Sequence, residues 1–418
     1  NMISSGTANL PLHMGRAPKF LTQRMGRLSI AIIEAIIQEH GKSELLTRLA
    51  DPNFFQSLAA MTGFQYSSSG STATLLGSLR REVNARSNEL GIHILGGKGK
   101  RGYSAPKQIE RMAEQTGVDG QELIQSCRLA NRVDSNCVQD GMSLYQSWFI
   151  CSDENEWVAI NQGLNTDDRR ARRYHWRSQN VRSFLDDPHV GIVGTRSDQP
   201  IVNLADSRAE NNRQNIIAMV QDSPKEIVDA CRHIDFGDYQ EVRKEDVNLT
   251  RLGAVLAIAQ ENGVDNFPDL VLLKGIGSKT LRSLALASEL IHADSPSRFS
   301  DPARFSFGIG GKDSNPFPLD LKAYDETIEH LQNAVENSTL GFDDQSKTLK
   351  RLFKVAQNIE RTQAPEADLD ALVEAEWERA EKEGGHTWMG RVTPILTRAI
   401  FSLQNAALYG KREIQKRK

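Results

Sequence analysis

The chain has 418 residues, of which 39% are hydrophobic and 25% are charged, and its formal net charge is −3. This composition is typical of globular domains and excludes a disordered chain or a uniformly basic, histone-like protein. No apolar stretch is long enough for a membrane-spanning helix, the first residues lack the pattern of a secretion signal, and the single cysteines favour a reducing, cytoplasmic location.

The N-terminal part of the chain predicts mainly helices. Residues 18–62 carry apolar side chains at helical spacing, and a helix is expected to end at Gly41. A second helical stretch is predicted to begin near Ser69. The apolar run at 91–95 predicts a short strand that leads into the loop "GGKGKRG". Further helices are predicted at 105–115 and 119–132.

The central part differs in composition, because aromatic and β-branched residues flank the turn-like "SDEN". Strands are predicted near 142–151 and 156–162, joined as a hairpin. The following "RRARRYHWRSQNVR" is expected to be a helix with Tyr174 and Val181 on its buried stripe. Residues 200–221 predict a strand that leads into a helix.

Beyond residue 245 the chain predicts helices almost throughout, apart from a glycine- and proline-rich interruption at 298–320. The expected fold class is therefore α+β and mostly helical. The expected regions are an N-terminal helical region (1–115), a central α+β domain with the β-hairpin (116–245), a helix-hairpin-helix domain (246–340) and a C-terminal helical region (341–418). The C-terminal helices are expected to mediate self-association or binding of a protein partner, or to cover the central domain.

Residues 270–285, "LVLLKGIGSKTLRSLA", place two glycines around an isoleucine between two apolar helical stretches. This spacing is typical of a helix-hairpin-helix element, because glycines expose backbone amides and the second helix directs its positive N-terminal end to the same place. The predicted phosphate contacts are Gly275, Gly277, Lys279 and Thr280. The alternative is a tight turn that binds nothing.

The same stretch resembles the hairpin of helix-hairpin-helix DNA glycosylases, in which a lysine follows the second glycine by two residues, as Lys279 does here. In that family a catalytic aspartate follows downstream. Asp294 and Asp301 are the candidates, although neither falls at the spacing that the resemblance implies.

Two other loops, at 96–102 and 308–316, pair glycines with lysines in a way that suits a bound oxyanion. Neither has the spacing of a Walker A loop. The arginine segment carries six arginines and no carboxylate, which favours phosphate contact over a solvated helix face. The phosphate-binding residues expected from these three segments are Gly97, Lys98, Lys100, Arg169, Arg172, Arg173, Gly311 and Lys312.

Candidate catalytic groups lie in the central part. Asp140 precedes the first predicted strand and Gln162 ends the second, an arrangement similar to nuclease sites that hold Mg²⁺ or Mn²⁺. Asp140 would be the metal ligand, but Leu164 stands where such sites have a lysine, and a turn-forming role for Asp140 is the alternative. His175 is a candidate general acid or base, or a half-buried structural histidine.

Several longer motifs, among them "GTANLPLHMGRAPKFLTQRM", "VQDGMSLYQSWF", "ARRYHW" and "DPARFSFGIGGKD", resemble the uncharacterised family known as domain of unknown function 763. The resemblance covers about residues 5–340. It implies histidines where this chain has Ser67 and Gln146, and it implies no activity.

The residues together predict a DNA-binding protein, a repair or processing enzyme of nuclease-like or glycosylase-like type. The alternatives are a non-catalytic DNA-binding or recruitment module and an enzyme that acts on small phosphorylated or nucleotide substrates. No membrane partner is expected.

Overall fold

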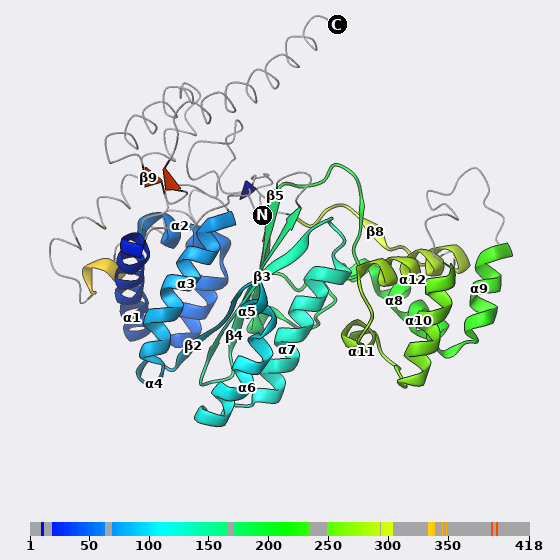
Figure 1. The fold of residues 1–418 in the computed structure, drawn as a ribbon, viewed down its shortest axis with the longest axis horizontal. Coiled ribbons are helices and arrows are strands. Elements are labelled where there is room, and N and C mark those ends of the chain that lie inside the picture. The colour runs from blue at the N-terminus through cyan, green and yellow to red at the C-terminus, as the bar shows by residue number, and fades with distance from the viewer. Residues whose placement is uncertain are drawn as a thin grey trace, which may run out of the picture.

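An antiparallel sheet of six strands lies at the centre of the computed structural model, which describes residues 10–11, 19–62, 69–165, 170–233, 249–292, 294–303, 333–338, 345, 348, 386–387 and 390–391. Its strand order is β1-β5-β4-β3-β2, and β6 pairs with β5 (Figure 1). The strands are β1 (Leu10–Pro11), β2 (Ile92–Lys98), β3 (Ser143–Ser152), β4 (Trp157–Asn165), β5 (Arg170–Arg177) and β6 (Gly191–Val193).

Helices cover both faces of this sheet (Figure 1). One face packs against α1 (Lys19–Ala50), α2 (Pro52–Thr62) and α3 (Ser69–Ala85), and α4 (Ser87–Leu90) leads into β2. The other packs against α6 (Ala105–Thr116) and α7 (Gly120–Arg132), with α5 (Lys100–Tyr103) at the edge. Because both faces are covered, β3, β4 and β5 are buried along most of their length.

A group of helices lies beside the sheet and packs on α7 and on the π-helix η1 (Val133–Cys137). It contains α8 (Glu210–Gln221), α9 (Pro224–His233), α10 (Leu249–Glu261), α11 (Phe267–Leu272) and α12 (Ser278–Ile291). The remaining short elements are η2 (Ser178–Asn180), β7 (Ile201–Val202), η3 (Ser207–Ala209), β8 (Arg298–Phe299), β9 (His386–Thr387) and β10 (Gly390–Arg391). The same hydrophobic core runs from α6 and α7 into this group.

The structure confirms the predicted fold class, α+β and mostly helical, and the predicted hairpin of β3 and β4. The helix end expected at Gly41 is a kink within α1, where Gly41 has φ 84°. Gly96, Gly97 and Lys98, expected in a loop, lie in β2 and pair with β3. This pairing also joins the predicted N-terminal region to the sheet of the predicted central domain.

The arginine segment is a strand, so the predicted helix is wrong. Residues 170–177 form β5 and pair with β4 along their whole length. Arginines usually mark a solvated face, but here the helices cover both sides of the strand, and Arg172, Arg173 and Arg177 are all buried. Tyr174 and Trp176, two residues apart, share one face, as the period of a strand requires.

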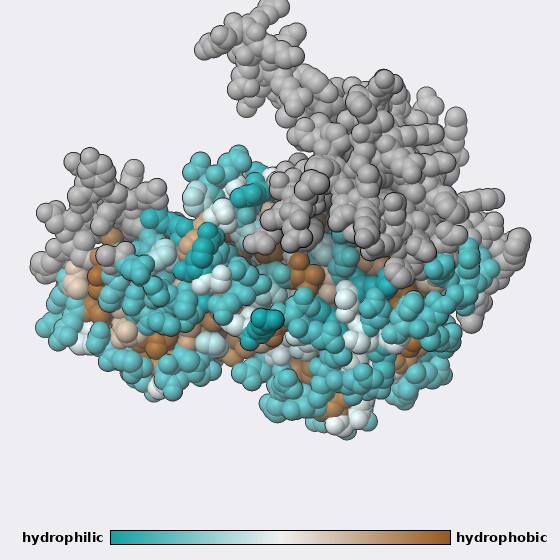
Figure 2. Space-filling model, turned by 180° about the vertical axis from the view of Figure 1, so that it is seen from behind, coloured by the Kyte–Doolittle hydropathy of each residue, from teal (hydrophilic) through white to brown (hydrophobic). Residues whose placement is uncertain are grey.

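On the face that Figure 2 shows, the described residues are mostly hydrophilic, with small hydrophobic areas between polar ones. Of the helices that the structure describes, none combines the length and the apolar character needed to cross a membrane. The free cysteines Cys127, Cys137, Cys151 and Cys231 are buried.

Candidate functional site

The helices α11 and α12 are joined by a short loop, residues 273–277. Asn266 caps α11 by accepting a hydrogen bond from the Asp269 amide at 2.9 Å. Gly275 has φ +95°, a conformation that favours glycine, and the chain then turns into α12. Ile276 is only 2% exposed and anchors the loop in the core between the two exposed or half-exposed glycines.

The outer side of this loop presents backbone amides and positive charge. In the described part of the chain, no acceptor contacts the amides of Gly275, Gly277, Ser278 or Lys279. Lys274, Lys279 and Arg282 are exposed around them. Since Ser278 and Lys279 begin a helix of 14 residues, the positive end of that helix lies at the same place.

The inner side of the loop is held by three polar contacts. Arg132 donates to the Ile276 carbonyl at 3.4 Å, and Gln139 donates to the Ser278 carbonyl at 2.8 Å. Arg251 donates through Nε to Thr280 Oγ1 at 3.1 Å, and Thr280 is only 1% exposed. Thr280, expected to contact phosphate, therefore lies on the inner side with its hydroxyl engaged by Arg251.

The second glycine–lysine segment, at 96–102, lies at the edge of the sheet where β2 ends. Lys98 and Lys100 are exposed, and the Lys98 Nζ lies 5.8 Å from the centre of the Tyr145 ring. Tyr103 is 74% exposed, and its hydroxyl donates to the Leu144 carbonyl at 3.2 Å. We call Lys98, Lys100, Arg101 and Tyr103 the edge surface.

Asp140 and Gln162 lie on opposite faces of the sheet. Asp140 Oδ2 accepts hydrogen bonds from Arg172 at 3.0 Å and Tyr174 at 2.6 Å, and these two side chains lie on the α7 face. Gln162 pairs with Arg173 and, because strand side chains alternate, points to the α1–α3 face. In this structure one metal ion would not contact both residues.

Asp140 is part of a buried ionic network. Arg172 also binds both carboxylate oxygens of Asp301, whose Oδ2 accepts from the Ser197 amide at 2.6 Å. Burial raises the pKa of Asp140, and the nearby Arg172 charge offsets only part of this rise. No group of three or more histidine, cysteine, aspartate or glutamate side chains that could hold a metal occurs within the described ranges. Arg172, expected at a phosphate, is held by two carboxylates.

Gln162 and His175 share the α1–α3 face with Arg173. Gln162 Nε2 donates to the Tyr145 hydroxyl at 2.7 Å, and Arg173 Nε donates to His175 Nε2 at 2.8 Å. Burial and the nearby Arg173 charge lower the pKa of His175 well below its usual value, so the imidazole is neutral at pH 7. Two of the three candidate catalytic residues are thus on one face, where Gln162 is the strand partner of Arg173 and His175 accepts its hydrogen bond.

Sequence reasoning missed Asp134, which accepts hydrogen bonds from Asn161, Trp176 and His189 on the α7 face. Its partners follow it by 27 to 55 positions. Contacts between residues so far apart in the sequence leave no local sequence pattern. Tyr103 was missed for another reason, because an exposed aromatic residue cannot be told from a buried one by composition.

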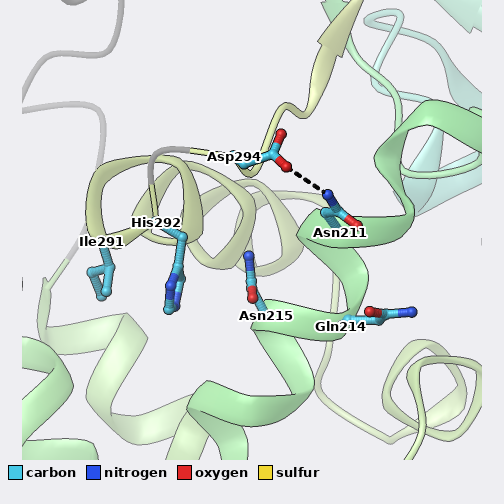
Figure 3. Close-up of a pocket in the computed structure, with 6 residues that line it drawn as sticks. All are labelled: Asn211, Gln214, Asn215, Ile291, His292 and Asp294. Atoms are coloured by element: carbon cyan, nitrogen blue, oxygen red, sulfur yellow. Dashed lines mark hydrogen bonds between the residues drawn. The ribbon is translucent and has the colours of Figure 1, made fainter.

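A polar hollow of about 450 Å³ lies between α8 and the end of α12 (Figure 3). Its lining comprises Asn211, Gln214, Asn215, Ile291, His292 and Asp294. Asn211 Nδ2 donates to Asp294 Oδ2 at 3.0 Å, so one of the two aspartates considered above lines a cavity. The other, Asp301, lies in the buried network with Arg172. Arg169, Gly311 and Lys312 fall outside the described residues.

The chain belongs to the family described as Protein of unknown function (DUF763), which matches residues 6–319. This finding confirms the resemblance carried by the sequence motifs. No curated protein and no solved structure matches the chain.

Proposed function

We propose that this member of the family binds DNA through residues 266–292, which act as a helix-hairpin-helix element on the sugar–phosphate backbone. The observation that supports this proposal is the set of amides at 275 and 277–279 that lack an acceptor in the described chain. A phosphate oxygen is an acceptor for such amides, and the exposed Lys274, Lys279 and Arg282 add charge attraction.

The geometry of Gly277 supports an external partner. Its φ of −127° is open to any residue, and a Cβ at this position would meet no atom within 4 Å. No packing within the described chain therefore demands a glycine there. A side chain would instead stand in front of the free amides, where the proposed phosphate approaches.

We expect Gly277→Asp and Lys279→Glu each to weaken DNA binding by about tenfold at low salt, and Lys279→Glu to reduce the slope of log K against log salt by about 1. Aspartate at position 277 would cap α12 and block its amides, so this variant should be as stable as the wild type. Fluorescence anisotropy with labelled duplex, single-stranded and branched DNA measures the affinities.

Lys225→Glu is the matched control, because Lys225 is exposed and undergoes the same change of charge. Lys225 lies near Asp222, whose carbonyl contacts Gln260 at the end of α10, whereas the hairpin contacts Arg251 at the beginning of that helix. Arg251 and Gln260 are about 14 Å apart along the helix axis, so Lys225 is far from the part of the hairpin that Arg251 contacts. Unchanged affinity of both hairpin variants for all three DNA forms would rule out the proposed contact.

The edge surface supplies a second part of the proposal, a contact with single-stranded DNA. Arg80 lies beside this surface and donates to the Gly96 carbonyl at 2.8 Å, and burial together with the nearby Arg101 charge lowers the pKa of Arg80. An exposed tyrosine ring beside lysines and an arginine suits a base stacked on the ring with its phosphates on the cations. The hydroxyl bond to Leu144 holds the ring in place.

Tyr103→Ala is expected to weaken binding of a single-stranded oligonucleotide by about 5- to 100-fold, whereas Tyr103→Phe keeps the ring and most of the affinity. An abasic oligonucleotide of the same length should bind the wild type and Tyr103→Ala equally. The idea of stacking fails if the alanine variant loses the same affinity for the abasic strand, because only charge would then be involved.

We extend this proposal to repair or processing of DNA in the cytoplasm, with Gln162 and His175 as the candidate catalytic residues. The alternative, a module without catalysis, is favoured by the separation of Asp140 and Gln162 across the sheet. A cleavage assay with Mg²⁺ or Mn²⁺ distinguishes the two. Cleavage that is lost in Gln162→Ala supports processing, and binding without cleavage supports the module.

A further inference from the structure

Arg173 differs from the other buried arginines of the described residues. Arg172, Arg177 and Arg213 each contact at least one carboxylate. Arg173 is 0% exposed and meets no carboxylate in the part of the chain that the structure describes. A buried positive charge without an anion is costly, so its surroundings require explanation.

The described residues that contact Arg173 carry no negative charge to balance its own. Nε donates to His175 Nε2, which must be the unprotonated nitrogen of a neutral imidazole. Nη1 donates to Thr72 Oγ1 at 3.1 Å, and the Phe55 ring centre lies 4.6 Å from the guanidinium carbon. Nη2 has no partner among the described residues. Burial accordingly lowers the pKa of Arg173 to about 9.

The first turn of α3 adds a second positive feature at the same position. Thr72 belongs to this turn, which begins a helix of 17 residues at Ser69. The first amides of a helix lack partners within the helix, and its dipole is positive there. The contact between Arg173 and Thr72 therefore brings an unbalanced guanidinium to the positive end of a helix.

A polar row leads from Arg173 to the edge of the sheet. Lys98, Gln146, Gln162 and Arg173 are directly paired across β2, β3, β4 and β5, so their side chains lie on the same face. Lys98 is exposed at the outer end of this row. The row therefore places an exposed cation, Lys98, and two buried amide side chains on the same face of the sheet as Arg173.

We propose that Arg173, Thr72 and the first turn of α3 bind a phosphate group, either inorganic phosphate or the phosphate of a nucleoside monophosphate. The planar guanidinium, with Nη2 still available, suits a phosphate oxygen. This site does not depend on the hairpin, from which it is separated by the sheet and α7. It goes beyond DNA binding, because its ligand is a small phosphate monoester or the free ion.

The test uses the full chain after extensive dialysis into phosphate-free buffer, with thermal unfolding as the readout. Inorganic phosphate and a deoxynucleoside monophosphate are titrated separately, with chloride at equal ionic strength as the control. A ligand at 100-fold excess over its Kd is expected to raise the Tm of the wild type by about 3–6 °C. A response to the monophosphate alone would assign the site to nucleotides.

Arg173→Met is expected to abolish this shift while folding at least as stably in phosphate-free buffer, since it removes an unbalanced buried charge. Thr72→Val preserves shape and should weaken the apparent affinity by about tenfold. Gly277→Asp, which removes the proposed DNA contact, should keep the full shift, so the two proposals fail separately. No shift in the wild type with either ligand, or an equal shift in Arg173→Met, would overturn the phosphate site.

Discussion

Asp301→Ala is expected to lower the free energy of unfolding by about 3–5 kcal/mol, because it leaves the buried Arg172 with one carboxylate and removes the acceptor of two amides. The Asp301 side chain is fully buried, and it accepts from Ser197 at 2.6 Å and Ala303 at 3.0 Å as well as from Arg172. Urea unfolding followed by tryptophan fluorescence measures the loss, since Trp148, Trp157 and Trp176 lie in the sheet.

Two further variants separate charge from hydrogen bonding. Asp301→Asn keeps an acceptor for the amides but removes the ionic contact, and its stability should fall between that of the wild type and the alanine variant. Asp198→Ala changes an exposed carboxylate next to Ser197, whose amide donates to Asp301, and should cost less than about 0.5 kcal/mol. Equal stability of Asp301→Ala and Asp198→Ala would show that the network does not stabilise the sheet.

This network also explains why the arginine segment misled sequence reasoning. Arg172 is neutralised by Asp140 and Asp301, which are 32 and 129 positions away. Arg177 meets Glu156 in the same way. The run itself contains no acidic residue, although the fold supplies acids to Arg172 and Arg177 from other segments. A local sequence pattern cannot reveal ion pairs between residues that are so far apart in the chain.

The elements that were predicted well depend on local physics. The helices on either side of residues 273–277 follow from apolar residues at helical spacing and from the glycines between them, all of which can be read within about 25 residues. The β3–β4 hairpin likewise follows from aromatic and β-branched residues around a turn. Of the candidate site, the open amides of the hairpin could be anticipated, whereas the surroundings of Arg173 could not.

The α11–α12 loop and the segment at 96–102 both place glycine beside lysine, but they do so for different physical reasons. Gly277 has free space around it, which fits a ligand outside the chain. Gly96 is required by the sheet itself, because a Cβ there would lie 2.1 Å from the Ser147 carbonyl oxygen. Glycine beside lysine is therefore required by close strand packing at Gly96, whereas packing places no such requirement on Gly277.

Gly96→Ala is accordingly expected to lower the free energy of unfolding by about 4–5 kcal/mol. Its φ of +86° disfavours any side chain, and the added methyl group would collide with the backbone of β3, which must shift. Lys98 and the rest of the edge surface come directly after Gly96 in the sequence. The affinity for single-stranded DNA should therefore fall together with the free energy of unfolding. Urea unfolding and anisotropy on the same samples measure both effects.

Gly117→Ala is the matched control for this prediction. Gly117 has φ +77° at the end of α6, but a Cβ there meets no atom within 4 Å, so only the backbone conformation is penalised, by about 1 kcal/mol. The difference between the two variants measures the steric term alone. If both cost the same, Gly96 is retained for its backbone conformation, and the close approach of β2 to β3 is not what positions the edge surface.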